Sequence, residues 1–304
     1  MLAIETRSLR KEFGQKVAVA DLTLQVGQGE VFGFLGPNGA GKTTSVKMLL
    51  GLVHPTSGEG RLLGEPLGRW SPRAKVGFLP EHFRFHDWLT ATEFLHLHSR
   101  LYGVPPAVAR KRVPELLDLV VLTEAANRKL REFSKGMLQR IGLAQAMLNE
   151  PALIFLDEPT SGLDPIGRRL VRDIIRDLRA RQTTIFLNSH LLSEVEITCD
   201  RVAFVKTGRV VRQATLAELA AGQTVVDLRV AGLTPETVNG LRNWTQDLTA
   251  QDGRLTLTLS DEEPLPAIAS YLIGQGARLY EMTPRRTSLE DMFLEIMGPD
   301  SKPG

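Results

Sequence analysis

A glycine-rich segment between residues 36 and 44 has the residue types of a phosphate-binding loop. It reads Gly36-Pro-Asn-Gly-Ala-Gly-Lys-Thr-Thr44 and fits the pattern G-x-x-x-x-G-K-[ST]. Glycines let backbone N–H groups approach phosphate oxygens without a Cβ in the way, and a helix that begins there adds the positive end of its dipole. We expect Lys42 to reach the β- and γ-phosphates of a nucleotide and the Thr43 hydroxyl to ligate Mg²⁺. The alternative is a chance match in a glycine-rich turn.

Two adjacent carboxylates follow an apolar run further along the chain, in Leu153-Ile-Phe-Leu-Asp157-Glu158. We expect Asp157 to hold Mg²⁺ through its water shell. Glu158, on the other side of the chain, is expected to polarise the attacking water as a general base. An acidic pair after a strand is usually only a solvated strand end. In a chain that also has a phosphate loop, such a pair is more often catalytic.

Two further positions have both a functional and a structural interpretation. His190 ends the next strand-like run, where its imidazole can hydrogen-bond a γ-phosphate or a neighbouring protein group. Ser134 opens the segment Ser-Lys-Gly-Met-Leu-Gln-Arg140, which has helical apolar spacing. Serine and glycine at a helix N-terminus can bind an anion, or the serine can be an N-cap and nothing more. Taken alone, both positions favour the structural interpretation.

The elements around these residues predict an α/β sheet. Residues 2–35 read as strands, and the apolar run Val31–Leu35 comes directly before the glycine loop and a helical pattern over Thr44–Leu52. Strand-like runs return at residues 152–156, 183–187 and 202–205. The segment from about Asp87 to Asn149 is almost entirely helical. We therefore interpret it as an insertion into an α/β sheet.

The composition changes at Gly222, where a second domain is expected to begin. From here the pattern is strand, helix, two strands around Asp252-Gly253, helix, strand and a last helix near Ser288–Met297. This order predicts a βαββαβ module with a terminal helix. The expected domains are residues 1–221, with the helical insertion at about 87–149, and residues 222–304.

In their order and spacing, these segments resemble ATP-binding cassette (ABC) proteins. The resemblance covers residues 2 to about 220, and its segments are the phosphate loop, Gly77-Phe-Leu-Pro-Glu81, Ser134–Arg140, Asp157-Glu158, Ser161-Gly-Leu-Asp164 and His190. It implies a RecA-like P-loop ATPase core with an inserted α-helical subdomain, which the small α+β C-terminal domain follows. It also implies a homodimer whose copies pair head to tail. Each ATP is then closed between one phosphate loop and the other copy's signature loop.

The resemblance also assigns residues. Phe13 stacks on adenine, and Asp164 lies in the loop that communicates between the two sites. The signature loop is Ser134, Lys135, Gly136 and Met137. The expected catalytic residues are Glu158, His190 and Lys42, and the expected Mg²⁺ ligands are Thr43, Asp157 and Glu81. The expected ATP-binding residues are Phe13, Gly36, Pro37, Asn38, Gly39, Ala40, Gly41, Lys42, Thr43 and Thr44.

Two departures from the family pattern bear on the expected kind of ABC protein. The signature reads Phe-Ser-Lys-Gly-Met where Leu-Ser-Gly-Gly-Gln is commonest, and Glu81 replaces the usual glutamine. The signature variant is similar to stand-alone ATPase subunits of bacterial exporters whose membrane subunits are separate chains. The closing stretch Thr287–Glu295 is also similar to the tail of such subunits. The expected function is ATP hydrolysis that drives export through integral membrane permease subunits.

Composition excludes some other classes. The 37 basic and 35 acidic residues give a net charge of +2, which is not the strongly basic balance of a nucleic-acid binder. The single cysteine, Cys199, excludes an internal disulfide and is expected to be a small buried side chain. No apolar stretch approaches the roughly 18 residues of a membrane span. Together with the resemblance, these features imply a location in the cytoplasm, at the inner face of the cell membrane through the permease.

Alternatives remain for the function and for one aromatic cluster. A soluble cassette ATPase acting on nucleic acid or ribosomes would be supported by fused cassettes, a coiled-coil arm or zinc-binding cysteines, and the sequence has none of them. A regulatory module with little turnover conflicts with the complete set of catalytic residues. The aromatic residues Phe83, Phe85 and Trp88 suit either a partner site or the core of the helical subdomain.

Overall fold

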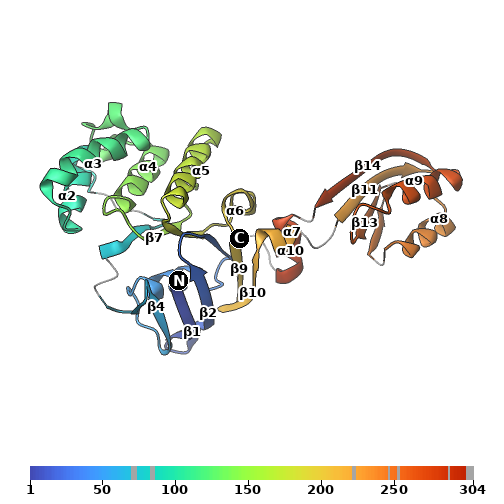
Figure 1. The fold of residues 1–304 in the computed structure, drawn as a ribbon, viewed down its shortest axis with the longest axis horizontal. Helices are drawn as coiled ribbons and strands as arrows, with labels where there is room; N and C mark the ends of the chain where they lie inside the picture. Colours follow the sequence, from blue (N-terminus) through green and yellow to red (C-terminus); the bar gives the residue numbers. More distant parts are fainter. Residues whose placement is uncertain are drawn as a thin grey trace. The chain divides into compact units, whose positions relative to one another are not determined.

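The structure, a computed structural model, describes residues 1–69, 74–82, 86–220, 224–245, 247–251, 254–286 and 288–298. Its chain forms two compact units (Figure 1). The cassette unit comprises Met1–Ala214 and Ile296–Gly304, and the C-terminal unit comprises Thr215–Glu295. The domain boundary expected at residues 221 and 222 lies outside the described residues and stays a prediction.

The cassette unit is built on one ten-stranded sheet with the order β5-β4-β1-β2-β10-β9-β3-β8-β7-β6. Strands β1, β2, β4 and β5 pair antiparallel, whereas β9, β3, β8, β7 and β6 pair parallel. All residues of β3, β7 and β8 are buried, as in parallel sheets covered on both faces. The strands are β1 (Leu2–Phe13), β2 (Lys16–Gly27), β3 (Val31–Leu35), β4 (Ser57–Leu62), β5 (Glu65–Pro66), β6 (Val76–Leu79), β7 (Leu153–Asp157), β8 (Thr184–Asn188), β9 (Arg201–Lys206) and β10 (Arg209–Thr215).

The predicted helical insertion is confirmed. Strands β6 and β7 are parallel neighbours, with Val76 opposite Leu153, and the chain between them forms α2, α3 and α4, which lie together in Figure 1. Helix α2 begins at a capping box in which the Thr90 and Glu93 side chains bond each other's backbone N–H. The helices of this unit are α1 (Lys42–Leu49), α2 (Ala91–Leu101), α3 (Pro106–Leu119), α4 (Lys135–Ala146), α5 (Pro165–Ala180) and α6 (Leu192–Thr198). Within the described ranges, no helix combines the length and apolar character of a membrane span.

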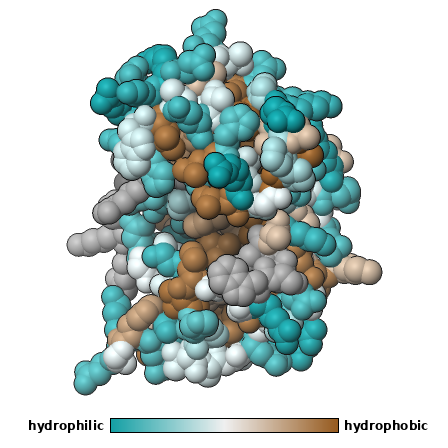
Figure 2. Space-filling view, turned by 90° about the vertical axis from the view of Figure 1, so that its left-hand side faces the viewer, coloured by the Kyte–Doolittle hydropathy of each residue, from teal (hydrophilic) through white to brown (hydrophobic). Residues whose placement is uncertain are grey.

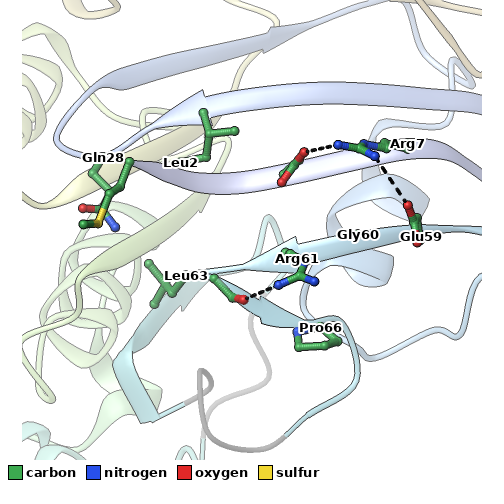
Figure 3. A pocket seen from close by; sticks show the side chains of 11 residues that line it. Leu2, Arg7, Gln28, Glu59, Gly60, Arg61, Leu63 and Pro66 are labelled. Atoms are coloured by element: carbon green, nitrogen blue, oxygen red, sulfur yellow. Dashed lines mark hydrogen bonds and ion pairs between the residues drawn. The ribbon is translucent and has the colours of Figure 1, made fainter.

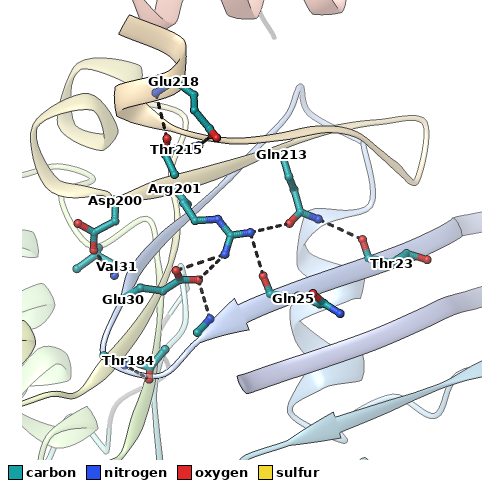
Figure 4. Close-up of polar contacts among 12 residues, drawn as sticks. Thr23, Gln25, Glu30, Val31, Thr184, Asp200, Arg201, Gln213, Thr215 and Glu218 are labelled. Carbon is teal, nitrogen blue, oxygen red and sulfur yellow. Dashed lines mark hydrogen bonds and ion pairs between the residues drawn. The ribbon is translucent and has the colours of Figure 1, made fainter. Parts of the chain in front are cut away.

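Arg201, the first residue of β9, connects the antiparallel and parallel parts of the sheet (Figure 4). Its guanidinium donates to both carboxylate oxygens of Glu30, at 3.3 and 3.4 Å, and to the backbone carbonyl of Gln25 at 3.4 Å. It also donates to Gln213 Oε1 at 3.2 Å, and Gln213 Nε2 donates to the Thr23 carbonyl at 3.3 Å. Because these partners lie on β2, on β10 and directly before β3, the network fixes the antiparallel strands against the core.

The C-terminal unit confirms the predicted βαββαβ order. Its four-stranded sheet has the order β12-β13-β11-β14 with antiparallel pairing throughout, which is the ferredoxin-like arrangement. The alternate residues Val226, Leu228 and Val230 of β11 are buried in a core shared with Ile268 and Leu272 of α9. Its elements are α7 (Leu216–Ala220), β11 (Thr224–Ala231), α8 (Pro235–Gly240), β12 (Leu248–Gln251), β13 (Arg254–Leu259), α9 (Leu265–Gly274) and β14 (Arg278–Arg286), followed by α10 (Leu289–Met297), which belongs to this unit up to Glu295.

A hollow of about 690 Å³ lies at the β1–β4–β5 edge of the cassette sheet, and Figure 3 shows the side chains that line it. Its charged lining is already paired. Arg7 contacts Glu5 at 3.0 Å and Glu59 at 3.9 Å, and Arg61 donates to the Gly64 carbonyl at 3.2 Å. Residues of the predicted nucleotide site do not line it. The chemistry expected from the sequence therefore lies elsewhere.

Candidate functional site

The phosphate loop connects β3 to α1, as the sequence predicts. Gly39 and Gly41 have φ values of +79° and +95°, which side-chain-bearing residues rarely adopt. A Cβ on Gly41 would lie 2.4 Å from the Ala18 carbonyl, so the loop packs directly on β2. Lys42 Nζ donates to the Gly36 carbonyl at 2.7 Å and to the Pro37 carbonyl at 3.2 Å. The lysine thus lies across the start of its own loop.

Three carboxylates lie near enough to Lys42 for their charges to act on its pKa. Burial lowers the pKa of Lys42, while the charges of Glu158, Asp157 and Glu81 oppose that shift. Burial raises the pKa of Asp157, the last residue of β7, and the charges of Glu81 and Glu158 add to the increase. Asn188, opposite Asp157 at the end of β8, donates to Asp157 Oδ1 and so opposes the shift. The site therefore holds more negative than positive charge.

Glu158 is held in a left-handed backbone conformation, with φ +53°. Its N–H donates to the Asn188 carbonyl at 2.8 Å, and its own carbonyl accepts from Gln139 Nε2 at 3.1 Å. These bonds fix a conformation that is unfavourable for a residue other than glycine. The side chain is nearly buried, and its Oε2 atom lies 2.7 Å from Nδ1 of the exposed His190. The predicted base and histidine are thus in contact.

The oxygen atoms of this site suit a magnesium ion that is bound partly by the protein and partly by the phosphates of a nucleotide. Among the described residues, no group of three or more His, Cys, Asp or Glu side chains could hold a metal ion. Mg²⁺ is usually bound by one or two carboxylates together with substrate phosphates, and the expected ligands Thr43, Asp157 and Glu81 stay a prediction. Asp157 provides a buried carboxylate, and Thr43 is exposed at the start of α1. The excess negative charge beside Lys42 also suits a cation.

Within a single chain, the expected signature loop packs against the segment that precedes Asp164. Ser134 is the N-cap of α4, and its Oγ accepts from the Met137 N–H at 3.3 Å, which confirms its structural interpretation. Asp164 likewise caps α5 and accepts from the Gly167 N–H at 2.7 Å. The Lys135 side chain covers Gly162, where an added Cβ would lie 2.7 Å from its Cε. An anion-binding role of the signature loop stays a prediction.

Phe13, the expected adenine partner, is half exposed at the end of β1, and Lys11 Nζ lies 4.9 Å from its ring centroid. Phe83 and Phe85 lie outside the described residues. Trp88 is exposed and stacks on His86, with 5.1 Å between the ring centroids. Cys199 is buried and unpaired, as predicted.

Asn188 and Gln139 are two site residues that the sequence reasoning did not single out. Asn188 bonds the Asp157 carboxylate, and Gln139 bonds the Glu158 carbonyl. A polar residue at the end of a buried strand, directly before Ser189-His190, is a signal that could have identified Asn188. Gln139 lies inside α4 and offers no such signal.

Comparison with known proteins agrees with this geometry. The ABC transporter family model matches residues 19–161. An uncharacterised ABC transporter ATP-binding protein of Nostoc sp. is 44% identical over 96% of this chain and 88% of its own. The Nod factor export ATP-binding protein I of Cupriavidus pinatubonensis is 37% identical over 98% of this chain and 92% of its own. A dimeric ATP-binding cassette, solved in a post-hydrolysis state with ADP and Pi, is 26% identical with a TM-score of 0.64, and the match covers 70% of this chain and 98% of that one. The chain therefore belongs to the ABC transporter ATP-binding proteins, and it is an ATPase.

Proposed function

We propose that this chain is the ATP-hydrolysing subunit of an exporter and that two copies close head to tail on two Mg·ATP. The observation that carries the proposal is the 2.7 Å contact between Glu158 Oε2 and His190 Nδ1, beside Lys42 and Asp157. A nearly buried carboxylate beside an imidazole is a suitable acceptor for a proton from water.

In the proposed reaction, Glu158 accepts a proton from a water molecule whose oxygen attacks the γ-phosphorus. The bond from that phosphorus to the β–γ bridging oxygen breaks, and ADP and phosphate are released. Lys42 binds the β- and γ-phosphates, and His190 orients Glu158 and the γ-phosphate. Mg²⁺, bound by Thr43 and Asp157 with Glu81 nearby, would neutralise charge on the phosphates. Phe13 would stack on the adenine.

The exposed position of the signature residues supports head-to-tail pairing. Ser134 and Lys135 are exposed, and Lys135 covers Gly162 of its own copy. The charged neighbours of Lys42 are instead Glu158, Asp157 and Glu81. A helix N-terminus with free N–H groups is suited to bind a phosphate. We propose that the signature loop binds the ATP held by the other copy.

Crosslinking between two differently labelled copies tests this pairing. A full-length Asn38→Cys variant, mixed with a Lys135→Cys variant, is expected to form a dimer crosslinked by a bismaleimide only with ATP. Each variant alone is expected to remain uncrosslinked, since the native Cys199 is buried. The reaction should be strongest in a Glu158→Gln background, where ATP is retained. Equal crosslinking with and without ATP would contradict head-to-tail closure.

Two observations support the export function: one relative is named for Nod factor export, and the surface of this chain has an exposed apolar strip (Figure 2). Figure 2 shows apolar side chains gathered in a strip down the face at the α2 end of Figure 1. Large exposed apolar residues in the helical insertion are Trp88, Leu101, Val108 and Val121. A contiguous apolar strip on a protein surface is typical of a site that binds another protein. Co-purification of an integral membrane protein from detergent extracts is the expected result, and a tagged chain that recovers only soluble partners would contradict it.

Glu81 permits a separate test of the metal assignment. Its side chain is about half exposed, and its charge acts on both Asp157 and Lys42. Glutamine keeps one oxygen donor and the chain length, so Glu81→Gln is expected to stay within about tenfold of wild-type turnover, a barrier change of about 1.4 kcal/mol. Glu81→Ala removes both oxygens and is expected to lower turnover further and to raise the Mg²⁺ concentration at half-maximal rate. An alanine variant with wild-type Mg²⁺ dependence would exclude Glu81 as a ligand.

A further inference from the structure

The turn between β9 and β10 contacts the phosphate loop directly. Thr207 and Gly208 have positive φ values of 47° and 73°, as in a two-residue hairpin turn. The Gly208 N–H donates to the Ala40 carbonyl at 2.9 Å. The Gly208 carbonyl accepts from the N–H groups of Ala20 and Asp21, at 2.8 and 3.0 Å. The turn thus joins the phosphate loop to β2.

These backbone segments are packed too closely for side chains. A Cβ on Gly208 would lie 2.8 Å from Ala20 N and 2.9 Å from Val19 Cα. A Cβ on Gly36, at the start of the phosphate loop, would lie 2.3 Å from the Val205 carbonyl oxygen. Because backbone atoms cannot move aside by a rotamer change, the position of the loop depends on the position of the turn.

The residue before this turn, Lys206, is held by the end of α10. Its Nζ donates to the Met297 carbonyl at 2.8 Å, and Met297 is 1% exposed. The last carbonyls of a helix lack partners within the helix and attract cations. Residues from Ile296 onward belong to the cassette unit, whereas Leu289–Glu295 of the same helix belong to the C-terminal unit.

We infer that the end of α10 is a positioning element for the phosphate loop. Met297 holds Lys206, Lys206 fixes the Thr207-Gly208 turn, and the turn fixes Ala40. Anchoring of α10 and binding of nucleotide are therefore coupled, and each strengthens the other by the same factor. The inference rests on the proposed binding of Mg·ATP by Gly36–Thr44.

Full-length variants test the coupling through the dissociation constant for Mg·ATP. Lys206→Met removes the ammonium group that donates to the Met297 carbonyl but keeps most of the aliphatic side chain. Met297→Ala removes most of a buried side chain and so weakens the packing of the end of α10. Each is expected to raise the dissociation constant about fivefold, which is typical of such coupling. Lys206→Arg is expected to restore tight binding. The matched control is Lys111→Met, whose ammonium pairs with Glu115 on α3, and it is expected to bind like wild type.

The double variant and hydrogen exchange separate positioning from general destabilisation. The double variant is expected to bind within about twofold of the weaker single variant, because both changes break one linkage. In wild type, Mg·ATP is expected to slow exchange of the backbone amides at residues 293–298, and Lys206→Met is expected to abolish that protection. A folded Lys206→Met protein that binds Mg·ATP within twofold of wild type would overturn the inference. A double variant whose loss of binding free energy equals the sum of the two single losses would also overturn it. A wild-type chain that binds no Mg·ATP would instead contradict the proposed function.

Discussion

Replacing Glu158 by glutamine is expected to preserve ATP binding while lowering turnover by about a hundredfold or more. Glutamine has nearly the same shape, so its amide can remain beside His190, where Glu158 Oε2 now lies 2.7 Å from Nδ1. The amide cannot accept a proton from water at neutral pH, and the positioned base is therefore lost. The backbone bonds to Asn188 and Gln139 do not involve the side chain and should persist.

This variant should also accumulate as an ATP-bound dimer, because the state that precedes hydrolysis is no longer consumed. Single-turnover hydrolysis, equilibrium ATP binding and the elution volume on a sizing column measure the three effects separately. Glu115→Gln is the matched control, since Glu115 is an exposed glutamate on α3. A Glu158→Gln protein that hydrolyses ATP at the wild-type rate would exclude Glu158 as the base, whatever its oligomeric state.

The sequence was sufficient to predict the parts of the site that depend on neighbouring residues. The phosphate loop follows a fully buried strand, and the strand before Asp157 is apolar at every position. Both features are read from runs of local sequence. The order of elements in the C-terminal unit was predictable for the same reason, because each helix and strand has its own apolar period. Strands β4 and β5, rich in glycine and charged residues, were not predicted.

What could not be predicted depends on contacts between distant segments. The bond from Asn188 to Asp157 requires β7 and β8 to be neighbours in one register. The left-handed conformation of Glu158 depends on partners 19 and 30 positions away, because Gln139 and Asn188 bond its backbone. Similarly, the glycine of the β9–β10 turn was visible in the sequence, but its bond to Ala40 was not. The sequence thus predicts which residues are candidates for the chemistry, and the sheet order determines how they meet.

Replacing Asp157 by asparagine is expected to have opposite effects on stability and on function. Burial and the charges of Glu81 and Glu158 raise the pKa of Asp157, so the folded protein favours the protonated carboxyl. That contribution to stability is present below the ordinary carboxyl pKa of about 3.9 and is lost as the pH rises through the raised value. At neutral pH the ionised side chain therefore destabilises the nucleotide-free fold. Asparagine removes this charge and can still accept the bond from Asn188.

The nucleotide-free Asp157→Asn protein is thus expected to melt at a higher temperature than wild type at pH 7, and the difference should shrink as the pH is lowered toward 4. Mg²⁺-dependent turnover should nevertheless fall by about 10- to 100-fold, as for other groups that support a metal. Addition of Mg·ATP should raise the melting temperature of wild type more than that of the variant, because a ligand stabilises the state that binds it. Asp118→Asn, at an exposed position of α3, is the control for the loss of one negative charge. Melting curves between pH 4 and pH 7 test this prediction. A variant less stable than wild type at pH 7 would contradict it, because it would show that the nucleotide-free and metal-free fold stabilises the ionised form of Asp157.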